Sequence, residues 1–371
     1  MMRKKSILFL ALTAVVLSAC KSSADQNFSG TVIDVPMLKE QKTDKPLRAD
    51  IIESFDTIRL EGSVLESFIG HVEDIKFSRD RIFVMSTDVI NIFDNDGKFL
   101  TTIQRKGRGP GEYISLRYFD ILEDQQLIYA VDNQGQQVVI YDFDGKFVRH
   151  IPMQCYDAAD FAVLPNGHML FMNLMGISQS ERGLYETDEN GQNMHPLFEV
   201  APDYQRLILG FKFLIHIDDN TIGCMGLEDT DYIYHYKNDS IGPVYKIKTD
   251  IVMPDQVRQG VKPDESSNEV YTKMQYWETR GYMGITLSNN DQFVFAMYNK
   301  ETAQTTRYYK SELMEPDPSL DFVPSFSFCY KNRMIIVYEA ETILQYEPLK
   351  KDFPGITIDS NPVLIIVKLK E

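Results

Sequence analysis

Three observations predict an all-β fold, a six-bladed β-propeller with four-stranded blades. Short runs of Tyr, Phe, Ile and Val, interrupted by turn residues, fill the 371-residue chain, and helical periodicity is nearly absent. One hairpin sequence recurs after 48 residues, beginning at Ile90 and again at Val138. Pairs of apolar strands precede such hairpins at a period of roughly forty to fifty residues, which is the spacing of propeller blades.

The hairpin repeat is clearest at residues 90–100 and 138–148. Each copy has an alternating strand, an Asp-Gly turn and a second strand that begins Lys-Phe. Degenerate copies follow at 183–191 and 232–239. The Asp-x-Asp-Gly turns mimic the opening of a calcium loop, but the position six residues beyond the glycine is Ile103 or Ile151 and not an acid. Turn chemistry therefore explains these residues.

Upstream of each hairpin we expect an inner strand and its partner, which gives six units in total. The predicted inner strands are 74–77, 118–122, 159–164, 213–217, 284–287 and 325–329, and their partners are 82–85, 127–131, 169–172, 221–225, 293–297 and 334–338. The last unit ends with a strand at 361–369 and has no fourth strand, whereas 52–60 is a spare strand at the start. We therefore expect the N-terminal strand to complete the last blade, which would leave no open edge.

The N-terminus resembles a secretory signal. Three basic residues precede an apolar run from Ile7 to Leu17 and then Leu17-Ser18-Ala19-Cys20. This pattern is typical of the bacterial lipobox, so residues 1–19 are predicted to be a lipoprotein signal peptide and Cys20 to carry lipid. Residues 20–30 are predicted to be a flexible tether, and 31–371 a single propeller domain. The alternative is an ordinary secretory signal with Cys20 as a spare thiol.

Charge and cysteine content exclude several classes of function. The formal charge is −16, and loss of the three basic residues in the signal makes it −19. Such an acidic protein is not expected to bind nucleic acid or an anionic membrane face by electrostatics. Cys155, Cys224 and Cys329 lack the Cys-x-x-Cys spacing of zinc or redox sites, and the sequence leaves open whether two of them pair.

These residues resemble a known group, the six-bladed β-propeller lipoproteins of Gram-negative envelopes, which are related in shape to TolB-like and NHL-repeat propellers. The resemblance rests on the Cys20 lipobox, the Asp-x-Asp-Gly-Lys-Phe hairpins and the element Gly107-Arg-Gly-Pro-Gly-Glu-Tyr113. It implies the propeller fold and an outer-membrane address. It carries over no catalytic residue.

The glycine-rich segment 107–111 is the first candidate for a binding site, because Arg105, Lys106, Arg108 and Arg117 flank it and an anion could be held there. The alternative is a tight crossing between blades, since the segment follows a strand and lacks a Gly-Lys-Ser/Thr ending. In that case Glu112 would neutralise one of the arginines.

A loop-rich face is the second candidate, because the long connections predicted at 174–183, 199–211, 249–283 and 311–324 open on the same side as residues 105–113. A short helix is predicted over 264–277, and its aromatic side chains would either bind a partner or cap the channel and bury Trp277. The predicted ligand-binding residues are thus Arg105, Arg108, Glu112, Tyr113, Tyr276 and Trp277.

No catalytic residue, metal site or cofactor is predicted, since the six histidines are scattered without ligand spacing. Propellers can still gather ligands from separate blades around the central channel, and the candidates for this are Asp74, Asp120, Asp160, His216 and Asp231. We predict a lipid-anchored, monomeric binding or scaffold module of the outer membrane, facing the periplasm, with a protein or glycan partner. The alternative is a lactonase-like hydrolase or lyase with a metal in the channel.

Overall fold

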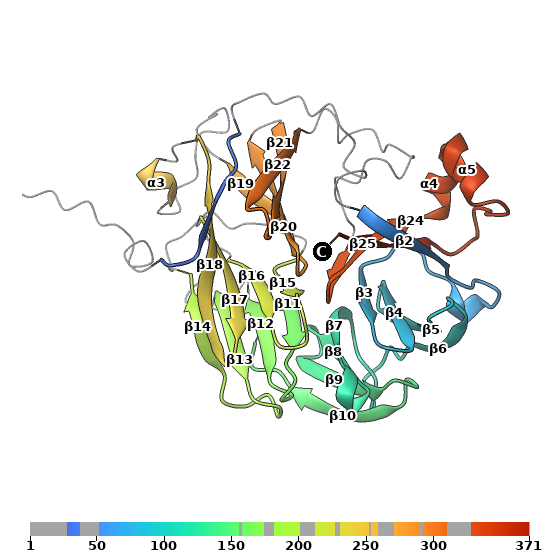
Figure 1. The fold of residues 1–371 in the computed structure, drawn as a ribbon. Helices are drawn as coiled ribbons and strands as arrows, with labels where there is room; N and C mark the ends of the chain where they lie inside the picture. Colours follow the sequence, from blue (N-terminus) through green and yellow to red (C-terminus); the bar gives the residue numbers. More distant parts are fainter. Residues whose placement is uncertain are drawn as a thin grey trace, which may run out of the picture.

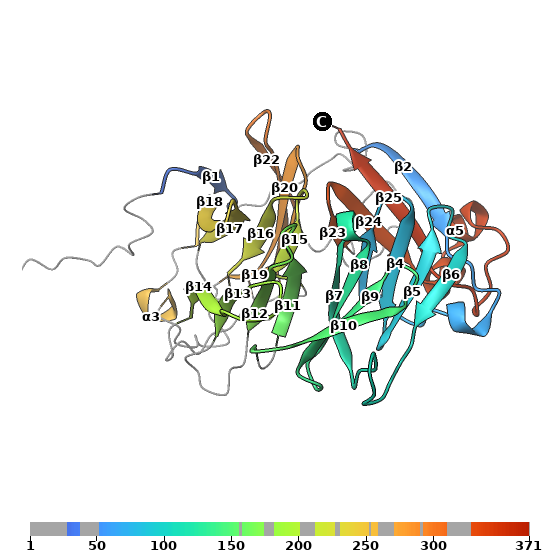
Figure 2. The same cartoon turned by 90° about the horizontal axis from the view of Figure 1, so that it is seen from below.

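The computed structural model describes residues 28–37, 52–155, 158–173, 182–200, 212–226, 231–251, 254–258, 271–289, 292–309 and 328–370. In this part of the chain six sheets, each with four antiparallel strands, stand around a central channel, so the predicted six-bladed propeller is confirmed (Figure 1). The first strand of each blade lies nearest the channel, and Figure 2 shows the same ring from below.

The blades are numbered in chain order. Blade 1 contains β3 (Asp74–Phe77), β4 (Arg81–Ser86), β5 (Val89–Asp94) and β6 (Phe99–Ile103). Blade 2 contains β7 (Leu116–Leu122), β8 (Leu127–Asp132), β9 (Gln137–Asp142) and β10 (Phe147–Pro152). Blade 3 contains β11 (Ala158–Val163), β12 (Met169–Asn173), β13 (Gly183–Thr187) and β14 (His195–Glu199).

The remaining blades complete the ring. Blade 4 contains β15 (Leu214–His216), β16 (Ile222–Met225), β17 (Tyr232–Lys237) and β18 (Ser240–Lys248). Blade 5 contains β19 (Thr272–Glu278), β20 (Tyr282–Asn289), β21 (Gln292–Asn299) and β22 (Gln304–Tyr309). Blade 6 contains β23 (Phe328–Tyr330), β24 (Arg333–Tyr338), β25 (Val363–Leu369) and β2 (Ile52–Arg59).

Helices are few and short among the described residues. They are η1 (Leu65–Ser67), η2 (Glu123–Gln125), α3 (Asp255–Arg258), α4 (Ala340–Gln345) and α5 (Glu347–Asp352). Within the described ranges, no helix has the length and apolar character needed to span a membrane.

The ring closes as the sequence predicts. β2 pairs antiparallel with β25, from Ile52 opposite Leu369 to Arg59 opposite Val363, and becomes the outermost strand of blade 6. Asn361 strengthens this junction, since its side chain accepts the Ile69 N–H at 2.9 Å and donates to the Glu61 and Ser67 carbonyls at 2.8 Å. The N-terminal and C-terminal parts of the domain are thus held together by one blade.

A further strand, β1 (Thr31–Asp34), is absent from the sequence prediction. It pairs in parallel with β18 and makes blade 4 a five-stranded sheet. Ile33, Val35 and Met37 are buried in the core between blades 3, 4 and 5, and the Val35 N–H donates to the Lys248 carbonyl at 2.7 Å. The residues next to the predicted tether therefore join blade 4 before the chain reaches the closing strand in blade 6.

Blade 5 corrects the sequence analysis. Residues 272–277, predicted to be helical, lie in β19, the innermost strand, so the predicted inner pair 284–287 and 293–297 forms instead the second and third strands. Burial on both faces of the strand favours the extended conformation, because Tyr276 packs against Gly223 of blade 4 and Trp277 occupies the space where Gly284 has no side chain. The start of the predicted helix, at Asp264, lies outside the described residues.

The repeated Asp-Gly hairpins have the predicted geometry. The Asp94 carboxylate accepts the N–H groups of Asp96 and Lys98, and Asp142 accepts those of Asp144 and Lys146 in the same way. Both turn glycines, Gly97 and Gly145, have positive φ angles of 84° and 74°. In each turn one carboxylate oxygen of the aspartate is therefore occupied by two backbone donors, as turn chemistry predicts.

Candidate ligand site at the mouth of the central channel

Three aspartates at matching positions of successive inner strands join the blades at the channel. Asp74, Asp120 and Asp160 each accept the N–H of the next residue through one carboxylate oxygen. The second oxygen of Asp120 accepts the Val163 N–H of blade 3 at 2.8 Å, and that of Asp160 accepts two N–H groups of blade 4 at 2.8 Å. A buried carboxylate needs such donors, so Asp120 and Asp160 each hold the neighbouring blade in register, whereas the second oxygen of Asp74 accepts hydrogen bonds from Lys76 and Lys212.

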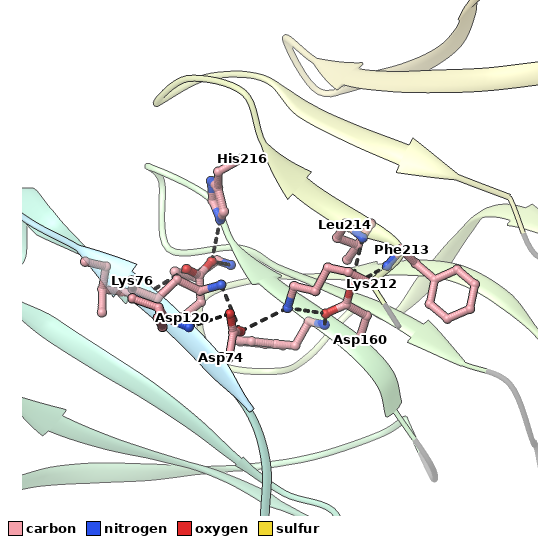
Figure 3. A network of polar contacts seen from close by, with 12 residues as sticks. Asp74, Lys76, Asp120, Asp160, Lys212, Phe213, Leu214 and His216 are labelled. Carbon is pink, nitrogen blue, oxygen red and sulfur yellow. Dashed lines mark hydrogen bonds and ion pairs between the residues drawn. The ribbon is translucent and has the colours of Figure 1, made fainter. Parts of the chain in front are cut away.

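Two lysines neutralise this ring of acids (Figure 3). Lys212 lies 2.8 Å from Asp160 and 3.1 Å from Asp74, whereas Lys76 lies 2.9 Å from Asp74 and over the rings of Phe119 and Tyr330. Burial opposes the charge on Lys212, but the two carboxylates outweigh it and raise the pKa of that ammonium. The lysines likewise outweigh burial and hold the pKa of Asp74 below its ordinary value.

At the other end of this network, Asp120 holds His216 of blade 4. The His216 Nε2 atom lies 2.6 Å from the Asp120 carboxylate, and both side chains are buried. Burial opposes ionisation of Asp120, but His216 outweighs it and lowers the pKa of the carboxyl group to about 2. Asp120 is therefore a hydrogen-bond acceptor and the Nε2–H group of His216 is the donor, which leaves Nδ1 outside this pair.

His216 Nδ1 has no hydrogen-bond partner within the described part of the chain, although the residue is only 6% exposed. His216 lines a cavity of about 470 Å³ at the mouth of the channel. Every blade contributes to the lining through the end of its inner strand or the turn that follows, and the charged members are Arg79, Glu123, Asp124, Asp218, Asp219, Arg280, Lys331 and Arg333. A cavity of this size is in the range of small-molecule sites.

Blades 4 and 6 meet beside this cavity. The Lys331 N–H donates to the His216 carbonyl at 2.7 Å, and the ring of Tyr330 packs edge-on against the His216 imidazole. These contacts hold His216 from the side of blade 6, and its imidazole lies between Asp120 and the cavity. Its backbone and one ring nitrogen are fixed, so Nδ1 is presented in a defined position.

The cavity opens on the face that carries the Asp-Gly turns. Asn95, in the turn of blade 1, donates to the carbonyl of Arg79 in the cavity wall at 2.6 Å. This is the opposite side from the loop-rich face favoured by the sequence analysis. Of the loops on that face, 174–181, 201–211, 259–270 and 310–327 lie outside the described residues.

In the predicted anion loop at 107–111, the backbone binds the carboxylate of the neighbouring Glu112. The Gly109 N–H donates to Glu112 Oε2 at 2.7 Å, and a side chain at Gly107 would meet the same oxygen at 1.9 Å. Arg105 donates to the Gly145 carbonyl at 3.2 Å, so it ties blade 1 to blade 2, and Glu112 accepts from the loop backbone where the prediction paired it with an arginine. Ligand binding by Arg105, Arg108 and Glu112 remains a prediction.

The predicted aromatic residues are not on an exposed face. Tyr113, Tyr276 and Trp277 are 0%, 1% and 2% exposed, so their expected exposure is wrong. The Tyr113 hydroxyl accepts the Arg105 N–H at 3.1 Å and donates to the Asp88 carbonyl, and burial raises the pKa of that phenol to about 12.

Tyr276 and Trp277 belong to the packing between blades. The Tyr276 hydroxyl donates to the Glu278 carboxylate, which also binds His235 at 2.8 Å, Tyr245 at 2.9 Å and Lys300 at 2.5 Å. Trp277 stacks on Phe295 at 6.1 Å between ring centroids. These contacts correspond to the alternative in which the segment buries its own tryptophan.

The channel candidates Asp74, Asp120, Asp160 and His216 are brought together, whereas Asp231 lies elsewhere and accepts the Tyr271 hydroxyl at 2.7 Å. Sequence analysis missed Lys76, Lys212 and the charged cavity wall. A signal was available, because Asp74, Asp120 and Asp160 are each followed by an apolar residue at matching positions of the repeat. The cavity residues follow the inner strands in turns of unequal sequence, so no pattern marks them.

No group of three or more His, Cys, Asp or Glu side chains is arranged to hold a metal ion in the part of the chain that the structure describes. No disulfide joins Cys155, Cys224 and Cys329 to one another. The fold and this cavity define an all-β propeller with a polar pocket at one channel mouth.

The chain belongs to the family described as a domain of unknown function (DUF4934), whose match spans residues 30–368. Comparison with curated proteins gives no match. A presumed exported protein from Bacteroides fragilis has a similar structure, with a TM-score of 0.69 and 16% identity over 92% of this chain and 100% of that chain. A DUF4221 member from Bacteroides vulgatus gives a TM-score of 0.53 and 10% identity over 86% of this chain and 98% of that chain.

Proposed function

We propose that this protein is a non-catalytic binding module of the cell envelope that holds a small polar solute in the cavity at the mouth of its channel. The observation that carries the proposal is His216, a buried imidazole with an unpartnered Nδ1 that lines this cavity. An unpaired polar atom costs free energy in a buried place, and a ligand that pairs with it recovers that cost. The polar wall built by all six blades favours a polar ligand over an apolar one.

Anchoring by lipid is the second part of the proposal. The Cys20 lipobox supports a lipoprotein attached to the outer membrane on the periplasmic side, acting as a monomer, and the exported description of the Bacteroides fragilis protein agrees with secretion. In cells given labelled palmitate, the wild-type chain should become labelled and remain with the membranes, whereas Cys20→Ala should do neither. Membrane attachment of an unlabelled wild-type chain would contradict this. The narrower likeness to TolB-like or NHL-repeat propellers stays a prediction.

Binding in the cavity is tested by filling it. Asn220 lines the cavity, and Asn190 is a matched control in a turn of blade 3, since both N–H groups donate to the aspartate two residues earlier at 2.9 Å. A set of neutral sugars, amino acids and hydroxy acids is measured by thermal shift and calorimetry. Solutes bound by the wild type and Asn190→Trp should be lost in Asn220→Trp. If no solute binds, or if Asn220→Trp binds normally, the cavity is not the site.

A hydrolase or lyase is the second candidate, and the Asp120–His216 pair is the observation that favours it. A carboxylate that fixes one nitrogen of an imidazole at a cavity wall and leaves the other nitrogen unpartnered is the arrangement of a general base. Mass spectrometry of each bound solute after incubation decides between the two functions. Conversion that is lost in His216→Gln supports the enzyme, and recovery of unchanged solute supports binding alone.

A further inference from the structure

The cations around the cavity differ in whether a carboxylate already neutralises them. Lys331 lies 2.7 Å from Asp219 and 3.6 Å from Glu123, and its hydrogen bond lowers the pKa of Asp219. Arg79 lies 3.6 Å from Glu123. These two cations therefore have partners within the protein.

Arg280 and Arg333 have no carboxylate partner among the described residues. The hydrogen bond made by Arg280 runs from its backbone N–H to Asn332 at 2.8 Å, and the Arg333 guanidinium lies 5.1 Å from the centre of the Phe77 ring. Both residues are exposed and line the cavity. Their guanidinium groups keep donors that suit a planar carboxylate.

The deep side of the cavity offers a different kind of group. His216 has its Nε2–H engaged with Asp120, so Nδ1 in the neutral ring is an acceptor. A hydroxyl group is a suitable partner, because it can donate to Nδ1. One cavity therefore presents two free guanidinium groups and one buried acceptor.

We propose that the cavity binds a small hydroxycarboxylate of the sugar-acid class, with its carboxylate on Arg280 and Arg333 and a hydroxyl donating to His216 Nδ1. This inference rests on the proposed function and names its ligand class. The charged lining contains four basic and four acidic residues, so the local charge is balanced. A monoanion that binds the guanidinium groups of Arg280 and Arg333 fits this balance. A phosphate dianion would bring a second negative charge close to the four carboxylates, which would repel it.

The test is calorimetric titration of the wild-type protein with glucuronate, galacturonate and gluconate, with glucose, galactose and inorganic phosphate as comparisons. The affinity of at least one acid should be at least about 10-fold higher than that of its neutral counterpart, and at least about 10-fold higher than that of phosphate. Arg280→Gln and Arg333→Gln should each weaken that acid by about 10- to 100-fold, the loss of a charge-assisted hydrogen bond, and should leave neutral sugars unchanged. His216→Gln keeps a donor toward Asp120, removes Nδ1 and should weaken acid and neutral sugar alike.

Arg117→Gln is the matched control, because Arg117 is an exposed arginine of β7 near the opposite end of that inner strand. It should bind the acid as the wild type does, and circular dichroism should show the same fold for all four variants. If neutral sugars bind with the same affinity as the acids, and neither arginine variant changes that affinity, the ligand class is overturned and the proposed function still stands. The class also fails if phosphate binds more tightly than every acid. Absence of cavity-dependent binding for every solute would overturn the proposed function itself.

Discussion

The buried carboxylate of Asp120 should make a measurable, pH-dependent contribution to stability. Its pKa in the folded protein is about 2, against an ordinary value of 3.8, and a difference of this size corresponds to about 2.5 kcal/mol. Because the folded state holds the proton more weakly than the unfolded state, this stability is fully present above about pH 5 and is lost as the pH falls through 2. About 1 kcal/mol of it should be lost by pH 3 and about 2 kcal/mol by pH 2.

The perturbation is Asp120→Asn, and the assay is urea unfolding at pH 7, 4, 3 and 2.5. Trp277 is the only tryptophan of the chain and is buried, so its fluorescence reports unfolding. At pH 7 the variant should lose at least about 2.5 kcal/mol, and the gap from the wild type should narrow as the pH falls. Asp124→Asn, at an exposed site in the following turn, is the control and should differ little from the wild type at any pH. A gap that stays constant across this range would refute the reasoning.

Three further changes test the packing of the ring. Lys212→Met leaves the buried carboxylates of Asp74 and Asp160 without their shared cation. Since the lysine side chain is 22% exposed, we expect the free energy of unfolding in urea to fall by about 2–3 kcal/mol. A fall below about 0.5 kcal/mol would contradict the bridging role. Gly284→Ala would put a Cβ 2.1 Å from the indole of the single tryptophan and should lower the free energy of unfolding by about 2–3 kcal/mol. Gly242→Ala, with nothing within 4 Å of the added Cβ, is the control and should lower it far less. Equal melting temperatures of the two variants would show that blade 5 is packed differently. Ile33→Ala removes a buried side chain of β1 and should cost about 2–4 kcal/mol, against less than about 0.5 kcal/mol for the exposed Val32→Ala; similar values for both would place β1 elsewhere.

The repeat carries most of the fold prediction, because each blade must repeat the same alternation and the same turn. This repeat predicted the hairpins that turn at Gly97 and Gly145 and the closing strand that begins at Ile52, and the structure confirms them. The inner strand of blade 5 was predicted wrongly because the segment 264–277 has apolar residues at helical spacing, at Val270, Met274 and Trp277. The strand around Gly284 has instead the alternation expected of an inner strand. Which strand is innermost depends on packing against blade 4, and this packing is not visible in a local pattern.

The site shows where local patterns stop being informative. Asp74, Asp120, Asp160 and His216 could be chosen in advance because inner strands face the channel in any propeller. Lys212 could not, since it precedes a strand of only three residues and acts by joining acids of two other blades. Ion pairs between residues 52 and 138 positions apart are a property of the closed ring.

The parallel pairing of β1 with β18 has a mechanical consequence. A pull on the N-terminus reaches blade 4 first, where four paired residues and the side chains of Ile33, Val35 and Met37 resist it in shear. The closing strand β2 lies beyond this attachment in the chain, so it is shielded from the force until β1 detaches. The protein can therefore be tethered by its N-terminus without placing tension on the strand that keeps the ring shut.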